Sequence, residues 1–264
     1  MGVPLIIKIG GIFLKNDIAM KRFFIELNKY IKLNDHPIIL VNGKNSIFTN
    51  VIKNKNLNNK KNNFFSIKNI NTTNLLSILL PNIVNIQLLA QSKNYDVHGN
   101  SVLLPDFFNN LINISNCYSV IKNFLKYKKE EILKYINFLK MFFKKKIIPF
   151  ICSMGFDKKG NIFNINSDIV SMILTIILKG KLIFLTDVSS VLNNKGQQIK
   201  KIYSKEIDYF IKSGIITDGM IIKVQSASIT SKFLKKPVKI SGWHYSEDLF
   251  NLFNNKSIGT KIYE

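Results

Sequence analysis

The stretch PLIIKIGG, residues 4–11, decides the class of fold. A run of apolar residues interrupted by one lysine and closed by two glycines is typical of a buried strand that runs into a tight turn. A lysine inside such a strand is costly unless a negative group faces it. Taken alone, the stretch leaves open whether Lys8 meets an acidic side chain, a phosphate or nothing in particular.

Short apolar strands alternate with helical patterns along the rest of the chain. Asn16 or Asp17 can cap the first helix, and Pro81 interrupts a later one. Because apolar strands separated by helices pack as a parallel sheet covered on both faces, we predict a three-layer α/β/α sandwich around a mainly parallel sheet of about eight strands. Further strands are expected at 36–43, 64–70, 95–104, 145–153, 181–187, 237–241 and 257–263, a hairpin at 156–165, and further helices at 71–92, 119–144, 167–178, 205–214, 219–235 and 246–253.

Lysine dominates the charge of the chain, in which 38 Lys and Arg residues face 16 Asp and Glu residues and the formal net charge is +22. The lysines are spread along the chain together with many Asn, Ile and Phe residues, the pattern expected when an AT-rich genome biases the codons. The clusters at 54–63 and 126–135 lack an interleaved aromatic platform of the kind that binds RNA. We therefore interpret them as solvated faces and expect no nucleic-acid partner.

Apolar runs, cysteines and histidines argue against several other classes of protein. The apolar runs fall far short of the ~20 residues that a membrane-spanning helix needs. The two cysteines, Cys117 and Cys152, lack the CxxC spacing of zinc sites, and the three histidines show no paired spacing of metal ligands. We expect a soluble, cytoplasmic protein with no membrane partner and no metal held by its own side chains.

Two of the few acidic residues stand at strand–helix junctions. Asp168 opens an apolar helix, and Asp187 closes the strand at 181–187. Open α/β sheets bind ligands at the carboxyl ends of their strands, where both residues are expected. Each also has a simpler interpretation, since Asp168 can be a helix cap and Asp187 a turn residue.

Four stretches together resemble the amino-acid kinase family: PLIIKIGG (4–11), FNINSDIVS (163–171), LIFLTDVSSVLNNKGQQI (182–199) and GIITDGMIIKV (214–224). The similarity runs to residue 262 and is strongest after about residue 145. It is closest to members that use ATP with Mg²⁺ to phosphorylate the γ-carboxylate of N-acetyl-L-glutamate in arginine biosynthesis. The resemblance implies one amino-acid kinase domain, 1–264, that forms a homodimer. It also implies a substrate-binding lobe at 1–165 and a nucleotide-binding lobe at 166–264.

The resemblance also implies roles for individual residues. Lys8 and Lys223 match the lysines that stabilise the transferring phosphoryl group, and Asp168 matches the aspartate that holds them in position. The remaining matches bind the two substrates. For the nucleotide they are Gly10, Asp187, Val188, Ser189, Ser190, Val191, Leu192, Ile215, Ile216 and Thr217, and for the acyl amino acid Gly11, Gly43, Lys44, Asn45, Ser66 and Asn164.

Three of these substrate-site residues depart from the family pattern. Lys44 and Asn45 replace glycines, and Ser66 stands where an arginine usually holds the α-carboxylate. Losing such a bidentate contact should cost roughly 2–4 kcal/mol of binding free energy. Either a nearby cation such as Lys44 or Lys68 compensates, or the chain is a weakly active or non-catalytic nucleotide-binding relative.

Overall fold

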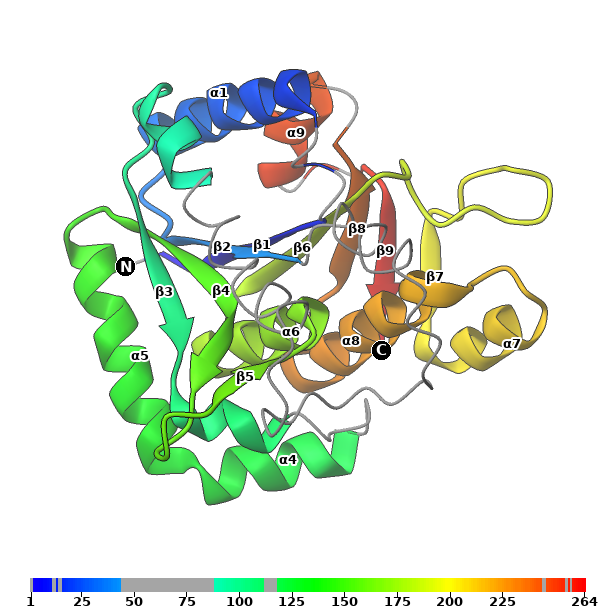
Figure 1. Cartoon of the computed structure of the whole chain (residues 1–264). Coiled ribbons are helices and arrows are strands. Elements are labelled where there is room, and N and C mark those ends of the chain that lie inside the picture. Colours follow the sequence, from blue (N-terminus) through cyan, green and yellow to red (C-terminus); the bar gives the residue numbers. More distant parts are fainter. Residues whose placement is uncertain are drawn as a thin grey trace, which may run out of the picture.

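The structure is a computed structural model that describes residues 2–10, 13, 16–43, 88–111, 118–243, 246–254, 256 and 258–264. These residues form a nine-stranded sheet in the order β3-β4-β2-β1-β6-β8-β9-β7, with β5 paired to β4 (Figure 1). The strands are β1 (Leu5–Ile9), β2 (Ile38–Asn42), β3 (Gly99–Leu104), β4 (Ile148–Phe156), β5 (Ile162–Asn164), β6 (Lys181–Thr186), β7 (Lys201–Tyr203), β8 (Val238–Gly242) and β9 (Thr260–Tyr263).

The predicted strand at 4–9 is the centre of this sheet. β1 pairs in parallel with β2 on one side and with β6 on the other, so Lys8 lies between Val41 and Phe184. Among the strand pairs that the described residues form, those of β4 with β5 and of β8 with β9 are antiparallel and the others parallel. The mainly parallel α/β/α sandwich predicted from the sequence is therefore confirmed.

Helices cover both faces of the sheet (Figure 1). α1 (Asp17–Leu33) and α9 (Ser246–Phe253) pack together on one face. The opposite face carries α4 (Tyr118–Tyr127), α5 (Lys129–Lys144), α6 (Ser167–Leu178) and α8 (Asp218–Leu234). Shorter helical elements are η2 (Asp106–Leu111), η3 (Ser204–Glu206) and α7 (Ile207–Lys212).

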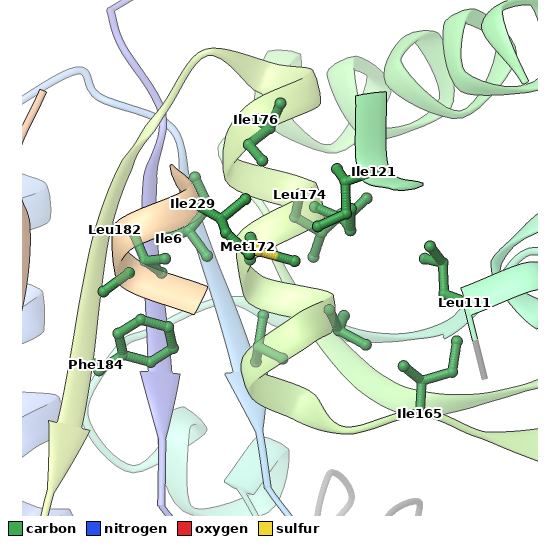
Figure 2. Packing of buried hydrophobic residues seen from close by; sticks show 14 of the residues in the cluster. Ile6, Leu111, Ile121, Ile165, Met172, Leu174, Ile176, Leu182, Phe184 and Ile229 are labelled. Atoms are coloured by element: carbon green, nitrogen blue, oxygen red, sulfur yellow. The ribbon is translucent and has the colours of Figure 1, made fainter. Parts of the chain in front are cut away.

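Successive side chains of β1 point to opposite faces of the sheet and belong to two separate core clusters. Leu5, Ile7 and Ile9 belong to the apolar cluster under α1, whereas Ile6 belongs to the cluster under α6 and α8. Figure 2 shows Ile6 beside Met172 of α6 and other residues of that second cluster. Since successive side chains of a strand point to opposite faces, Lys8 follows Ile6 toward α6.

A third, small cluster lies on β4. Cys152 and Met154 are buried there together, and Cys152 has no exposed surface. Burial raises the pKa of the Cys152 thiol to about 12, because the thiolate would lose its hydration.

Several predicted boundaries are confirmed by side-chain and backbone geometry. Asn16 caps α1, and its Oδ1 accepts a hydrogen bond of 2.9 Å from the Ala19 amide. The β4–β5 hairpin turns at Gly160, whose φ is +79°, and α7 is followed by Gly214 with a φ of +72°. Both glycines adopt the left-handed conformation that other residues rarely adopt.

The single helix predicted at 119–144 is wrong, because the structure has two helices that meet at Lys128. Lys128 leaves helical geometry with φ −104° and ψ 22°, and its Nζ pairs with Glu131 at 3.2 Å. Glu130 and Glu131 then stand in the first turn of α5, where acidic side chains favour a helix start.

Other differences are smaller. The sequence patterns do not predict β7, and the strand predicted at 95–104 begins only at Gly99, because Asp96 adopts a positive φ of 57° in a turn. The strand predicted at 64–70 and most of the helix predicted at 71–92 lie outside the described residues. Within the described ranges, no helix combines the length and the apolar character that crossing a membrane requires.

Candidate active site

Two lysines and one aspartate meet at the centre of the molecule. Lys8 Nζ of β1 lies 2.9 Å from Asp168 Oδ1 of α6, and Lys223 Nζ of α8 lies 3.1 Å from the same oxygen. All three side chains are more than nine-tenths buried. The structure thus brings together the three residues predicted to be catalytic, although they lie far apart in the sequence.

The local sequence explains how Asp168 is held. Asn166 caps α6, and its Oδ1 accepts a hydrogen bond of 2.8 Å from the Asp168 amide. The capping role that the sequence left open for Asp168 therefore belongs to Asn166. The Asp168 carboxylate is left available for the two ammonium groups.

Lys223 reaches Asp168 across an aromatic surface. Its Nζ lies 5.3 Å from the centre of the Phe184 ring, within the range of a cation–π contact. Phe184 also packs in the core under α6 and α8 (Figure 2). The ring orients the lysine while excluding water from one side of it.

Burial and charge act in opposite directions on these groups. Burial alone would raise the pKa of Asp168, but the ammonium groups of Lys8 and Lys223 outweigh it and hold that pKa below its ordinary value. Burial, together with the charge of Lys8, lowers the pKa of Lys223 to about 8. With both lysines protonated the cluster carries one net positive charge, which favours the binding of an anion.

Glycines let the backbone approach this cluster closely. The Gly43 amide, after β2, donates to the Ile9 carbonyl at 3.0 Å. A Cβ on Gly43 would crowd Ser167 Oγ at 3.2 Å and would be in ordinary contact with Lys8 Nζ at 3.5 Å. Gly10, after β1, has the Leu185 carbonyl oxygen 3.5 Å from its would-be Cβ.

The loop after β6 crosses the carboxyl end of β8. The Gly242 amide donates to the Ser189 carbonyl at 3.1 Å, and a Cβ on Gly242 would meet the Ser189 Cα at 2.8 Å. The Val191 amide donates to Thr260 Oγ1 at 2.9 Å, which fixes the far end of the loop. The loop is thus held by its backbone in a close approach that requires a glycine beneath it.

Side chains of this loop divide between surface and interior. Asp187 is exposed and accepts a hydrogen bond of 2.9 Å from Thr186 Oγ1. These features are also consistent with the simpler interpretation of Asp187 as a turn residue. Val188, Ser189 and Leu192 are exposed as well. Ser190 is buried, and its Oγ has no hydrogen-bond partner among the described residues.

The predicted nucleotide segment 215–217 leads directly into α8. The amides of Ile215 and Ile216 both donate to the Phe210 carbonyl at 3.0 Å. Ile216 is buried, while Thr217 is the exposed residue before α8. The segment therefore fixes the start of the helix that carries Lys223.

Asn164 lies at the end of β5, opposite Met154 of β4. Its Oδ1 is buried and has no hydrogen-bond partner among the residues that the structure describes. The other predicted substrate residues, Gly11, Lys44, Asn45 and Ser66, lie outside the described residues, as does Lys68.

Sequence reasoning missed Ser167 and Phe184, both of which contribute to the surroundings of the cluster. Ser167 precedes Asp168 in α6, and its hydroxyl faces Gly43 as described above. The position of Ser167 next to Asp168 in the sequence could have indicated a role in the site. Whether the Ser167 hydroxyl faces the site, however, depends on the packing of α6 against β2. The contact of Phe184 with Lys223 likewise depends on how α8 crosses β6.

Residues 4–240 match the amino acid kinase family. The chain belongs to this family. Two acetylglutamate kinases of Buchnera aphidicola subsp. Acyrthosiphon pisum are similar over nearly the whole chain: the strain Tuc7 protein is 35% identical and the strain 5A protein 34% identical, each over 98% of this chain and 99% of the relative.

Solved structures show the same amino acid kinase fold at lower identity. The protein smu.665 from Streptococcus mutans UA159 superposes with a TM-score of 0.66 at 21% identity and covers 98% of both chains. An N-acetylglutamate synthase from Neisseria gonorrhoeae, complexed with coenzyme A and N-acetyl-glutamate, gives a TM-score of 0.73 at 13% identity. The match covers 99% of this chain and 59% of the synthase chain.

Proposed function

We propose that the protein is an acetylglutamate kinase, which transfers the γ-phosphoryl group of ATP to the γ-carboxylate of N-acetyl-L-glutamate. The full-length similarity to two proteins of that name supports the proposal. The observation that carries it is the buried cluster of Lys8, Asp168 and Lys223 with its net positive charge.

In the proposed reaction, a γ-carboxylate oxygen of the acid attacks the γ-phosphorus. The bond from that phosphorus to the β–γ bridging oxygen breaks, and N-acetyl-L-glutamyl 5-phosphate and ADP are formed. The acceptor is already ionised at neutral pH, so no general base is needed. Catalysis then consists of positioning and of stabilising the negative charge on the transferring group.

Lys8 and Lys223 would supply that stabilisation from two sides. They approach from β1 and α8, and Asp168 sets their separation by holding both ammonium groups on one oxygen. Without the aspartate, two buried ammonium groups would repel each other and one would lose its proton.

We further propose that residues 166–264 form the nucleotide-binding lobe and residues 1–165 the substrate-binding lobe. β6, β8, β9 and β7 form one side of the sheet, and β1 to β5 form the other. The loop 187–192 and segment 215–217 belong to the first side, and Gly43 and Asn164 to the second. The seam between β1 and β6 would then be the place where the two substrates meet.

Mg²⁺ is proposed to arrive with the nucleotide. In the described ranges no group of three or more His, Cys, Asp and Glu side chains is placed to hold a metal. Asp168 is committed to two ammonium groups, so it is poorly suited as a ligand. The β- and γ-phosphates and water fit the oxygen preference of Mg²⁺ and would hold it.

We also propose that the protein is a homodimer that works in the cytoplasm, where its co-substrate ATP is available. The outer face of α5 supports the dimer, because Leu133, Phe138 and Met141 are exposed by 50%, 42% and 61%. Analytical ultracentrifugation of wild type and Leu133→Asp tests this: a dimer that the substitution dissociates is expected, and a monomeric wild type would contradict it.

Steady-state release of ADP tests the proposed activity. With Mg-ATP, we expect saturable release that depends on N-acetyl-L-glutamate, and we expect Lys8→Ala to lower turnover by at least about 100-fold. Lys122→Ala on the exposed surface of α4 is the matched control and should behave as wild type. Binding of ATP without release of ADP would instead identify a non-catalytic nucleotide-binding protein. That alternative follows from Ser66, which stands where an arginine usually binds the α-carboxylate.

A further inference from the structure

We propose that the Ser167 hydroxyl is a third donor in the active site and binds an anionic oxygen in front of Gly43. The inference rests on the proposed kinase function and deepens it. It concerns the space bordered by Gly43, Ser167 Oγ and Lys8 Nζ, here called the Gly43 gap.

The geometry of the Gly43 gap is the first observation. From the position that a Gly43 Cβ would occupy, Ser167 Oγ is 3.2 Å away, the Ile9 carbonyl oxygen 3.4 Å and Lys8 Nζ 3.5 Å. The Ile9 carbonyl already accepts the Gly43 amide at 3.0 Å. The Ser167 hydroxyl and the Lys8 ammonium group therefore both lie at contact distance from the unsubstituted face of Gly43.

The hydroxyl of Ser167 is not needed for the structure of α6. Asn166 caps the helix by accepting from the Asp168 amide, and the Ser167 carbonyl accepts from Ser171 Oγ at 2.6 Å. Ser167 is buried, with 8% of its surface exposed, and its Oγ makes no hydrogen bond to any described residue. Among the described residues the hydroxyl hydrogen of Ser167 has no acceptor, so it is available to an oxygen of a bound ligand.

The charges around the Gly43 gap favour an anion. Ser167 is the first residue of α6, whose amino-terminal end carries the positive pole of the helix dipole. Lys8 Nζ also lies beside Gly43, and the cluster that Lys8 forms with Asp168 and Lys223 keeps one net positive charge. The anionic oxygen belongs either to the γ-phosphoryl group or to the γ-carboxylate of the acceptor, and both are consistent with this chemistry.

Kinetics of Ser167→Ala test the inference. A hydrogen bond to a charged group is worth about 10- to 100-fold in affinity or rate, and we expect a loss of that size in kcat/KM. A rise in the KM for ATP would assign the contact to the phosphoryl group, and a rise in the KM for N-acetyl-L-glutamate to the carboxylate. A fall in kcat alone would mean that the bond forms only in the transition state.

Ser171→Ala is the matched control, since it removes a buried hydroxyl one turn later in the same helix. We expect this variant to keep the wild-type kcat and KM, and Ser167→Thr, which retains a hydroxyl, to recover most of the activity. Values of kcat and both KM within twofold of wild type for Ser167→Ala would overturn the inference. An equal kinetic loss in Ser171→Ala would overturn it too, because the effect would then be structural.

Calorimetric titration separates this inference from the proposed function. If the wild type binds Mg-AMP-PNP and N-acetyl-L-glutamate but shows no turnover, the proposed function fails. Ser167→Ala should still weaken binding of one of the two ligands by about fivefold or more. Unchanged affinity for both ligands, with no loss of turnover, would reject the role of Ser167.

Discussion

At the scale of single residues, Asp168 is the group on which the most depends. Among the described residues it is the carboxylate that faces both Lys8 and Lys223, and it lies almost entirely inside the protein. Its removal leaves two buried ammonium groups facing each other, whereas removal of one lysine leaves a neutral pair. Stability and activity should therefore respond differently to substitutions in the same cluster.

Substitution of Asp168→Asn is expected to lower the free energy of unfolding by about 3–5 kcal/mol, because it leaves buried charges uncompensated. Lys8→Met should cost much less stability, since Asp168 and Lys223 still balance each other, although it should abolish turnover. Urea denaturation of the two variants beside wild type measures the difference. Equal losses of stability would contradict the counter-ion role of Asp168.

The pH dependence of activity should follow Lys223. Its pKa is lowered to about 8 by burial and by Lys8, so the free enzyme loses this positive charge as the pH rises through that value. We expect kcat/KM to fall above about pH 8. A profile that stays level to pH 9.5 would show that Lys223 remains protonated or has no part in catalysis.

Stability should change in the opposite direction over the same range. Because the pKa of Lys223 is lowered in the folded state, the unfolded chain binds more protons between about pH 8 and the ordinary lysine value of 10.5. The contribution of Lys223 to the free energy of unfolding therefore rises with pH there. In Lys223→Met, urea denaturation at pH 8 and pH 10 should show a smaller rise than in wild type.

At the scale of elements, β4 shows how a close approach of backbones positions a residue of the site. β4 pairs with β3 on one edge and with the hairpin partner β5, and the register against β3 shifts between Val102 and Leu104. Gly155 stands where the two neighbours converge: a Cβ there would overlap the Leu104 carbonyl oxygen and lie 2.6 Å from Phe163 Cζ. Asn164 follows Phe163 directly in β5, so this packing also fixes where Asn164 lies.

Substitution of Gly155→Ala is expected to lower the free energy of unfolding by about 1–3 kcal/mol, because backbone atoms of β3 would have to move. Gly219→Ala in α8 is the control, since a Cβ there has no atom within 4 Å. It should raise stability by about 0.5–1 kcal/mol through the loss of chain entropy in the unfolded state. Thermal or urea unfolding of both variants checks the pair, and a neutral Gly155→Ala would contradict the close approach.

Some elements of the fold could be predicted from the sequence and others could not. The apolar run at 4–9 and the Asn16 cap were predictable, because local composition decides them. The break at Lys128 was not, because amphipathic spacing continues across it and only backbone geometry shows the second helix start. In the site, Lys8, Asp168 and Lys223 were found through motifs, whereas Ser167 required the packing of α6 against β2.

At the scale of the whole molecule, the net charge of +22 opposes the folded state. Exposed lysines repel one another in a compact chain more than in an expanded one. The sequence interpretation of these lysines as a solvated face implies that the repulsion is long-ranged and therefore sensitive to salt.

Raising the NaCl concentration from about 20 mM to about 500 mM is therefore expected to raise the melting temperature, because salt at this concentration screens charges more than a few ångströms apart. Sodium sulfate would also strengthen the hydrophobic effect, so NaCl is the better choice. Differential scanning calorimetry at constant pH measures the shift. A melting temperature that stays constant or falls with NaCl would contradict net repulsion.

The buried thiol of β4 can report how often the sheet opens. A thiol reacts with alkylating reagents as the thiolate, and Cys152 has no exposed surface and a pKa raised to about 12. In a Cys117→Ser chain, the rate of labelling would therefore measure the openings of the sheet beside the site. Ligands that bind only the closed molecule would slow the labelling, so occupancy could be followed without any turnover.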